Sequence, residues 1–399
     1  MTTISAPARR SWRGLLAVAA AAVVVASAVG FFRAFEMPGT DPAGAMGSMA
    51  DRRLHGMALA DMPEMFVAGT ALLLALGAAL VLGRTRHSVA PVALPQPKVR
   101  GKRTIAVVAT AALTIDISKT STLGFVIPGL RAEYGIDAST ASLLAVSGLS
   151  GTALGALLCS QLAERIGRRA CYLLATLGFT ATSMCGTMPN FGGNAVMCFL
   201  MGIAVGGLAP MLITVLSDLF PGRGRGAVVT GLSIVATAIG YLVASGSALW
   251  LEPVFGWRVL WLIGAPTGLL LAAAAAVIPD QRSAPAQPAT ETNWLARNTL
   301  TTRLQWVFAF SIGLTTFGLT TWVPTLSRVG GLSLTTANAL LTGSAVAMVL
   351  CAGLLVLGYR RFGPTGVTVR CWPSAPRCCC WHSRCPDGQS PRRGCRPPC

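Results

Sequence analysis

The stretch SQLAERIGRR, residues 160–169, is a short and densely charged segment between two long apolar runs. The flanking runs, near residues 139–159 and 170–188, are each long enough to cross a bilayer as a helix, which takes about 20 residues. A charged segment of this length predicts an antiparallel hairpin of membrane helices, with its arginines held at one membrane face. The stretch therefore indicates an inter-helix loop rather than the active site of an enzyme.

The composition extends this interpretation to the whole chain. Of 399 residues, 53% are hydrophobic and 12% are charged, against about 25% charged in a typical soluble domain. Such a balance favours a polytopic α-helical protein whose main partner is the lipid bilayer, because membrane helices satisfy their own backbone hydrogen bonds. The net charge of +18 would suggest nucleic acid in a soluble protein. Few aromatic residues interleave with the basic ones, so we expect no nucleic-acid partner.

The apolar runs predict about ten transmembrane helices. Arg9, Arg10 and Arg13 precede the run from Leu15 to Phe32, a layout that a signal peptide shares. This run is longer than a usual signal core, which favours an uncleaved first helix. The other spans are expected near 65–83, 104–129, 139–159, 170–188, 195–216, 227–250, 259–278, 304–323 and 335–357.

Linker-like stretches divide these spans into groups of two, six and two. The predicted parts are an extra two-helix amino-terminal membrane segment (1–88), a basic linker (89–103), six helices (104–280), a cytoplasmic linker (281–303), two helices (304–364) and a tail (365–399).

The distribution of Lys and Arg predicts the orientation. With the amino terminus inside, 25 of the 32 basic residues fall on the inner side, 6 fall on the outer side, and Lys119 lies within a helix. Cytoplasmic loops carry the excess of Lys and Arg. We therefore expect a multi-pass protein of the inner (plasma) membrane with both termini in the cytoplasm.

The tail differs in character from the rest of the chain. Residues 371–399 hold seven of the twelve cysteines, including three in a row at 378–380, together with many Arg and Pro. We expect an aberrant end produced by a reading-frame shift or truncation. Zinc binding, which lacks paired C-x-x-C spacing here, and palmitoylation are the alternatives.

The 160–169 loop resembles the signature G-x-L-A-D-R-x-G-R-R between helices 2 and 3 of the major facilitator superfamily. Glu164 stands in the place of the Asp, and Ser160 in the place of the first Gly. By this resemblance the carboxylate of Glu164 engages the amino terminus of helix 11 in the outward-facing state, which is a favourable dipole contact. The matching residues are Leu162, Ala163, Arg165, Gly167, Arg168 and Arg169.

Further motifs follow in the family's order. Asp218, Pro221, Arg223 and Arg225 resemble the acidic-x-x-Pro-x-Arg-x-Arg-Gly motif. Gly202, Gly206, Gly207 and Pro210 give the preceding helix a small-residue face that permits close packing, and Gly256-Trp257-Arg258 is expected outside. Two features depart from the family. Cys198 stands where the fourth helix often carries Arg, and the second half has two helices where the family has six, so the Glu164 contact has no partner. The predicted fold class is an all-α major facilitator-like bundle with an incomplete second half.

Asp116 and Lys119 are the candidate proton-coupling and substrate residues. They lie three residues apart in the helix near 104–129 and hence on one face, and an ionisable group in a membrane helix usually lines a cavity. Asp116 could accept a coupling proton and Lys119 could attract an anion; the alternative is a structural ion pair. Thr120 could bind the solute or bond back to its own helix, and Tyr241 could line the cavity.

These features predict secondary transport of a small, anionic organic solute by proton-coupled symport, with alternating access of two halves. Such transporters take up solute and protons, and the sequence indicates no protein partner. The fifth helix has no Pro after Gly240, unlike the family's drug antiporters. A multidrug/proton antiporter and a truncated, non-transporting membrane protein remain alternatives. The chain has no P-loop, its three histidines are scattered, and no nucleophile–base set is visible, so we expect no enzyme activity, cofactor or metal.

Overall fold

The computed structural model describes residues 6–36, 54–57, 59–86, 99–220, 225–278 and 299–371. The expected tail lies almost wholly outside these residues, as do most of the two predicted linkers. The described part is all helix, with no strand. Its helices are α1 (Ala6–Glu36), α2 (Pro63–Arg86), α3 (Val99–Tyr134), α4 (Ala138–Ile166), α5 (Arg168–Thr182), α6 (Phe191–Gly206), α7 (Leu208–Leu219), α8 (Arg225–Phe255), α9 (Val259–Leu262), α10 (Gly264–Ala274), α12 (Thr299–Val329) and α13 (Leu334–Cys371), with short 3-10 turns η1 (Leu59–Asp61) and η2 (Ser183–Thr187).

The predicted polytopic, all-helical fold is confirmed, and each of the ten predicted spans is helical. Seven helical segments among the described residues are long and apolar enough to cross a membrane, and α6 with α7 forms one of them. The other three spans are α3, which carries Asp116 and Lys119, α5 with its 3-10 extension η2, and the pair α9 and α10.

Two expected helices are interrupted, and a proline explains each break. The span near 195–216 divides after Gly206, and the span near 259–278 divides after Leu262. Pro210 and Pro266 have no N–H to donate to the carbonyl four residues earlier, which belongs to Gly206 and Leu262 respectively. The carbonyls of Gly206 and Leu262 therefore lack the usual helical hydrogen bond, and these are the residues at which α6 and α9 end.

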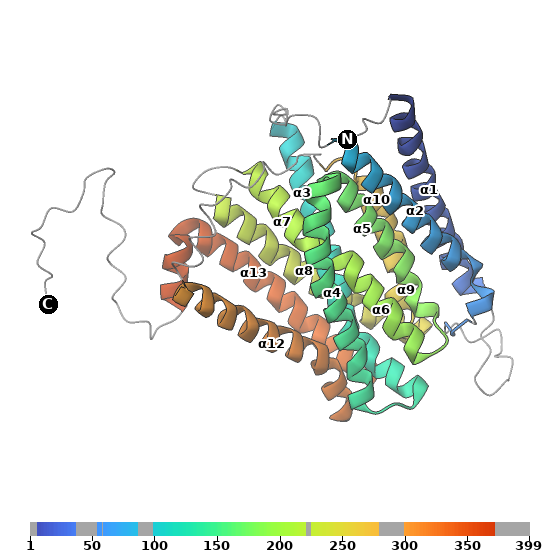
Figure 1. The fold of residues 1–399 in the computed structure, drawn as a ribbon. Coiled ribbons are helices and arrows are strands. Elements are labelled where there is room, and N and C mark those ends of the chain that lie inside the picture. Colours follow the sequence, from blue (N-terminus) through green and yellow to red (C-terminus); the bar gives the residue numbers. More distant parts are fainter. Residues whose placement is uncertain are drawn as a thin grey trace, which may run out of the picture.

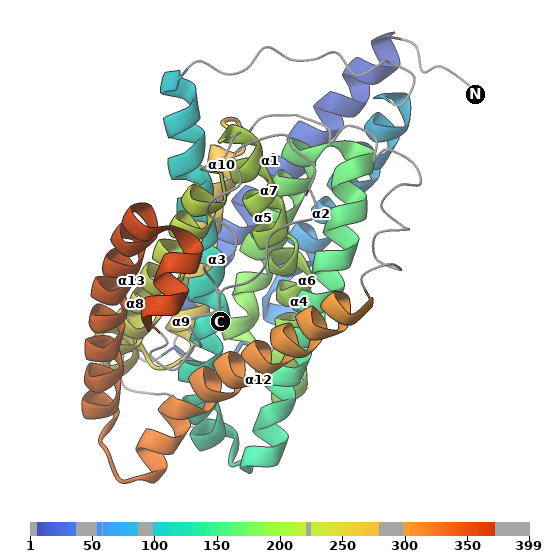
Figure 2. The same cartoon turned by 90° about the vertical axis from the view of Figure 1, so that its left-hand side faces the viewer.

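The helices pack as one bundle, with the amino-terminal pair at one edge and the last pair at the opposite edge (Figure 1). The hairpin of α1 and α2 packs on α5, and α2 also contacts α4. On the other side α13 packs against α8, while α12 crosses obliquely and contacts α3 (Figure 2). At its amino end α3 extends well beyond its neighbours (Figure 2).

The loops predicted to face outward gather at one end of the bundle. There the N–H of Leu54 donates to the carbonyl of Phe255 at 3.0 Å. Arg33 pairs with Glu64 at 2.8 Å, which ties α1 to α2. The alternation of helix directions that the sequence predicts is therefore present, and the 160–169 loop lies at the opposite end.

Candidate functional site

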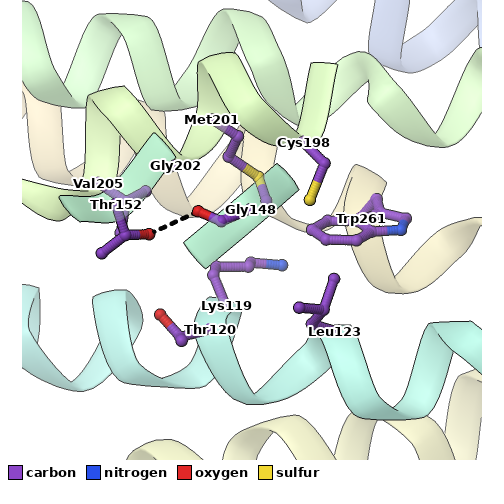
Figure 3. Close-up of a pocket in the computed structure, with 10 residues that line it drawn as sticks. All are labelled: Lys119, Thr120, Leu123, Gly148, Thr152, Cys198, Met201, Gly202, Val205 and Trp261. Carbon is purple, nitrogen blue, oxygen red and sulfur yellow. Dashed lines mark hydrogen bonds between the residues drawn. The ribbon is translucent and has the colours of Figure 1, made fainter. Parts of the chain in front are cut away.

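A small cavity lies in the middle of the bundle between α3, α4, α6 and α9, with a volume of about 30 Å³. A single water needs about 10–15 Å³ by this measure, so the pocket admits about two waters and not an organic solute in this conformation. Its wall is largely apolar and carries few polar groups, as Figure 3 shows. The lining residues are Lys119, Thr120, Leu123, Gly148, Thr152, Cys198, Met201, Gly202, Val205 and Trp261.

Glycines bring the walls of this cavity together. A Cβ atom on Gly202 of α6 would lie 2.8 Å from the backbone nitrogen of Thr152 in α4, closer than packed atoms can approach. A Cβ on Gly148 would lie 2.9 Å from the sulfur of Cys198. The predicted small-residue face of this helix is therefore in contact with α4, and glycines on α4 meet it.

Lys119 supplies the cationic group of the cavity. Its side chain is buried, and its ammonium group donates to the carbonyl oxygen of Leu260 at 3.0 Å. This one donated bond leaves two of the three N–H donors of the ammonium group for another acceptor. The ring of Trp261, the residue after this carbonyl, forms an adjacent part of the wall (Figure 3).

Asp116 is buried on the same helix but lies away from the cavity lining. Its Oδ1 atom has no hydrogen-bond partner. The side chains of Asp116 and Lys119 form no ion pair, so the structural ion pair weighed in the sequence analysis is absent.

Of the other two candidate substrate residues, Thr120 lines the cavity and Tyr241 does not. Thr120 lines the cavity, and its hydroxyl donates back to the carbonyl of Asp116 at 3.2 Å. Tyr241 in α8 is half-buried and lies outside the lining; its ring centre is 6.1 Å from that of Phe125. The structure therefore brings Lys119 and Thr120 to the cavity and leaves Asp116 and Tyr241 outside its wall.

Most of the stretch 160–169, which the sequence predicted as a loop, is helical: α4 continues to Ile166 and α5 begins at Arg168. The connection is a tight turn at Gly167, at the opposite end from Arg258, and the name 160–169 loop is kept for this stretch. Gly167 adopts φ 98°, a conformation that L side chains rarely adopt, and it joins the end of α4 directly to the start of α5. Arg168 is buried and pairs with Asp218 at 2.5 Å, which links the loop to the end of α7. Two motifs that lie 50 residues apart are thus in contact. Of the remaining motif residues, Leu162 is half-buried, and Glu164, Arg165 and Arg169 are exposed.

The second basic motif is only partly described. Arg223 lies outside the described residues, and α8 begins at Arg225, whose side chain also lies outside them. Their part in the conformational loop stays a prediction.

Arg258 makes several hydrogen bonds at the end of the bundle that is predicted to face outward. Its guanidinium group is buried and donates to the carbonyls of Gly186 at 2.8 Å and Met188 at 2.9 Å. It also pairs with Glu133 at 2.5 Å. The indole N–H of Trp257 donates to the other oxygen of Glu133 at 2.7 Å. The Gly-Trp-Arg motif therefore ties α9 to α3 and η2.

A second polar cluster joins the first six-helix group to the last two helices. Glu252 in α8 is buried; Arg328 of α12 pairs with it at 2.8 Å, and the amide of Asn338 in α13 donates to it at 2.9 Å. Sequence reasoning missed Glu252, Glu133 and Asn338. The signal for Glu252 was available, because it is the only acidic residue within the apolar sequence of α8.

The comparisons with known proteins agree with this architecture. The family model described as Major Facilitator Superfamily matches residues 106–374, which is more than half of the chain. The chain therefore belongs to the major facilitator superfamily, and the resemblance stated from the 160–169 loop is confirmed. With its long apolar helices, it is a multi-pass membrane protein.

Its relatives are named as transporters. The 4-hydroxybenzoate transporter PcaK of Acinetobacter baylyi is 32% identical over 42% of this chain and 36% of its own. The gallate transporter of Pseudomonas putida is 30% identical over 55% of this chain and 57% of its own. The gentisate transporter of Corynebacterium glutamicum is 27% identical over 60% of this chain and 57% of its own. The chain thus spans about a third to somewhat more than half of the length of these relatives.

A solved structure, that of a D-xylose-proton symporter, is 16% identical to this chain. It is matched over 65% of this chain and 69% of its own, with a TM-score of 0.49.

Proposed function

We propose that this chain moves a small anionic organic solute across the inner membrane by proton-coupled symport. The observation that carries the proposal is the buried ammonium group of Lys119 on the wall of a mostly apolar cavity. A fixed cation with free donors in such a site favours a carboxylate over a neutral solute, because charge-assisted hydrogen bonds are about twice as strong as neutral ones. Protons and the solute are the partners that this function requires.

Asp116 is the proposed proton acceptor. It is buried, it lacks a partner for Oδ1, and it lies one helical turn before Lys119. Protonation would remove a buried charge at little cost, whereas a carboxylate held in an ion pair would resist it. The hydroxyl of Thr120 donates to the backbone carbonyl of Asp116, one turn earlier in α3.

The relatives indicate the class of solute. Three of them are named for 4-hydroxybenzoate, gallate and gentisate, each an aromatic carboxylate. Trp261 and Met201 supply apolar surface around Lys119 that an aromatic ring could contact, and a solute of this size requires the cavity to be wider than in this structure. We propose an aromatic carboxylate as the solute.

The test separates binding from transport. The cavity is lined only by α3, α4, α6 and α9, so binding of labelled 4-hydroxybenzoate to the detergent-purified chain can be measured by itself. Lys119→Met should weaken binding by roughly ten- to a hundredfold, the equivalent of about 1.5–3 kcal/mol for a hydrogen bond to a charged group. Arg303→Gln, which removes an exposed cation, should bind like the unmodified chain. Equal binding by the Lys119 variant would overturn the proposed role.

Transport is measured in proteoliposomes with an imposed pH gradient. Asp116→Asn should abolish uptake driven by the gradient while solute exchange at equal pH persists, because exchange needs no net proton movement. Uptake by this variant at the unmodified rate would show that Asp116 does not couple protons. Extrusion of dyes instead of uptake would favour the multidrug antiporter, and binding without uptake would favour the non-transporting alternative.

The proposed orientation places both termini and the 160–169 loop in the cytoplasm. A green fluorescent protein fused after Arg169 should be fluorescent, since that protein folds on the cytoplasmic side. Alkaline phosphatase fused after Asn190, at the end that holds the Arg258 cluster, should be active because it needs the oxidising exterior. The reverse pattern would contradict the orientation derived from Lys and Arg.

A further inference from the structure

The second helix of the amino-terminal hairpin, α2, packs against the bundle along one face. One face of α2 is a series of alanines with relative exposures of 0 to 6%, and the opposite face exposes Leu73 and Leu74. Small side chains let the α2 backbone approach its neighbours closely. Leu72 lies beside Gly178 in α5, where an added Cβ would be 3.6 Å from its Cδ2. The buried alanines are Ala68, Ala71, Ala75, Ala78 and Ala79.

The segment before α2 is fastened to the outer end of the six-helix group. The N–H of Met57 donates to the carbonyl of Thr187 at 2.8 Å, in addition to the bond from Leu54 to Phe255. Gly56 packs on Pro189, where a Cβ would lie 2.8 Å from the backbone. Met62 is buried and accepts from the hydroxyl of Thr187 at 3.1 Å. The start of α2 is therefore held by backbone bonds as well as by apolar contact.

At the other end α2 touches the 160–169 loop. A Cβ on Gly83 would lie 2.7 Å from the carbonyl oxygen of Arg165 and 3.0 Å from Cγ2 of Ile166. Gly83 thus rests against the last turn of α4, next to the turn at Gly167. The side chain that follows this turn is Arg168, which holds Asp218.

We propose that α2 is a positioning element and that Gly83 is its positioning residue, setting the place of the 160–169 loop and through it the Arg168–Asp218 pair. A helix pair that served only as a lipid anchor would need apolar surface and no more. The backbone bonds at the outer end and the close contact at the inner end have no use in an anchor. Instead, α2 runs the length of the bundle. Backbone hydrogen bonds fix its outer end, and its inner end contacts the 160–169 loop.

The proposal rests on the proposed function in one respect: the loop is taken to change its contacts during transport. Gly83 lies outside the cavity lining. A change at Gly83 should therefore alter the loop without altering solute binding, and this split identifies a positioning role.

The test uses the arginines of the loop as trypsin sites in inside-out vesicles that carry the full chain. Gly83→Val would push on the Arg165 carbonyl, so cleavage between α4 and α5 should become several-fold faster. Gly77→Val is the matched control, because it adds the same β-branched residue to the same helix where no atom lies within 4 Å. Gly83→Ala, with only a Cβ to accommodate, provides a milder variant if Gly83→Val does not fold.

The outcomes separate the alternatives. Faster cleavage in both Gly83 variants, with cleavage of Gly77→Val and 4-hydroxybenzoate binding of all three unchanged, supports the proposal. Cleavage of the Gly83 variants at the unmodified rate overturns it, and so does equal acceleration by Gly77→Val, which would indicate general loosening of α2. Since cleavage needs no transport, a failure of the proposed function would appear in the uptake experiment and not in this one.

Discussion

Buried charged residues in this bundle differ in whether they have partners. Arg258 and Glu252 are held on several sides by carboxylate, amide or carbonyl groups. Lys119 has one backbone partner, and Oδ1 of Asp116 has none. A buried charge with several partners holds the packed helices in one arrangement. A buried charged group with few partners is available to bind a ligand or a proton.

The sequence predicted Asp116 and Lys119 as candidate site residues, but it did not predict that their side chains have different surroundings. The position of Asp116 and Lys119 within an apolar span marks them in the sequence. Whether they pair depends on a carbonyl that lies 141 residues further along the chain from Lys119, at Leu260. Spacing within one helix carries no information about such a contact.

Asp137 at the start of α4 gives a residue-scale prediction. Hydrogen bonds from Ser139 and Thr140 lower the pKa of Asp137 to about 2, from an ordinary value of 3.8. A lowered pKa adds stability that is fully present above the unfolded value and is lost as the pH falls through about 2. The melting temperature of the unmodified chain should exceed that of Asp137→Ala at pH 6, and the difference should shrink between pH 4 and pH 2.

Asp137→Asn is the control for this prediction. It keeps an oxygen that accepts from the helix N–H groups but does not titrate. Its melting temperature relative to Asp137→Ala should therefore change little over the same pH range. A pH-independent difference between the unmodified chain and Asp137→Ala would contradict the assignment.

At the scale of elements, α4 and α6 are joined backbone to backbone. The sequence predicted the small-residue face on α6, including Gly202 and Gly206. It did not identify the partner, because glycines occur throughout the chain and only the packing shows which of them meet. On α4 the partners are Gly148, Gly151 and Gly155.

Gly206→Ala should therefore destabilise the bundle. The added Cβ would overlap the backbone of Thr152, lying 2.7 Å from its Cα. Overpacking of this kind costs about 1–3 kcal/mol, and the melting temperature in detergent would measure it. Gly246→Ala in α8 is the matched control: no atom lies within 4 Å of its Cβ, so it should be neutral or stabilise by up to roughly 1 kcal/mol. Equal effects of the two changes would refute the close contact.

At the scale of the whole molecule, the number and order of the helical spans were predicted from the sequence. The length of each apolar run predicts a span, and the distribution of Lys and Arg between the runs predicts its direction. The docking of the amino-terminal hairpin on α5 was not predicted. A lipid-facing helix and a helix buried by alanines have similar composition, and only the neighbouring surface distinguishes them.

The cluster around Glu252 should govern how firmly α12 and α13 are attached to the first six-helix group. Glu252→Gln leaves the guanidinium group of Arg328 without its counter-charge, and breaking a buried pair costs about 3 kcal/mol at the lower end of measured values. Thermal unfolding in detergent should show this loss. The exchange of the two charges, Glu252→Arg with Arg328→Glu, should restore part of it.

The control for the Glu252 prediction is Glu164→Gln, which neutralises an exposed carboxylate and should leave the melting temperature unchanged. If the charge exchange were no more stable than the single Glu252 variant, the attachment would not depend on this pair.

The length of α3 has a consequence for where the molecule sits in its bilayer. Its 36 residues span about 54 Å at 1.5 Å per residue, well beyond a hydrocarbon layer of about 30 Å. The overhang at its amino end carries Lys102 and Arg103, and the proposed orientation brings these side chains to the level of the inner-leaflet phosphates. Anionic lipids attract such residues by about 1 kcal/mol each. In this orientation, that attraction would fix the depth of α3 in the bilayer. Because α3 carries Lys119, the depth of the cavity below the headgroups would be fixed as well.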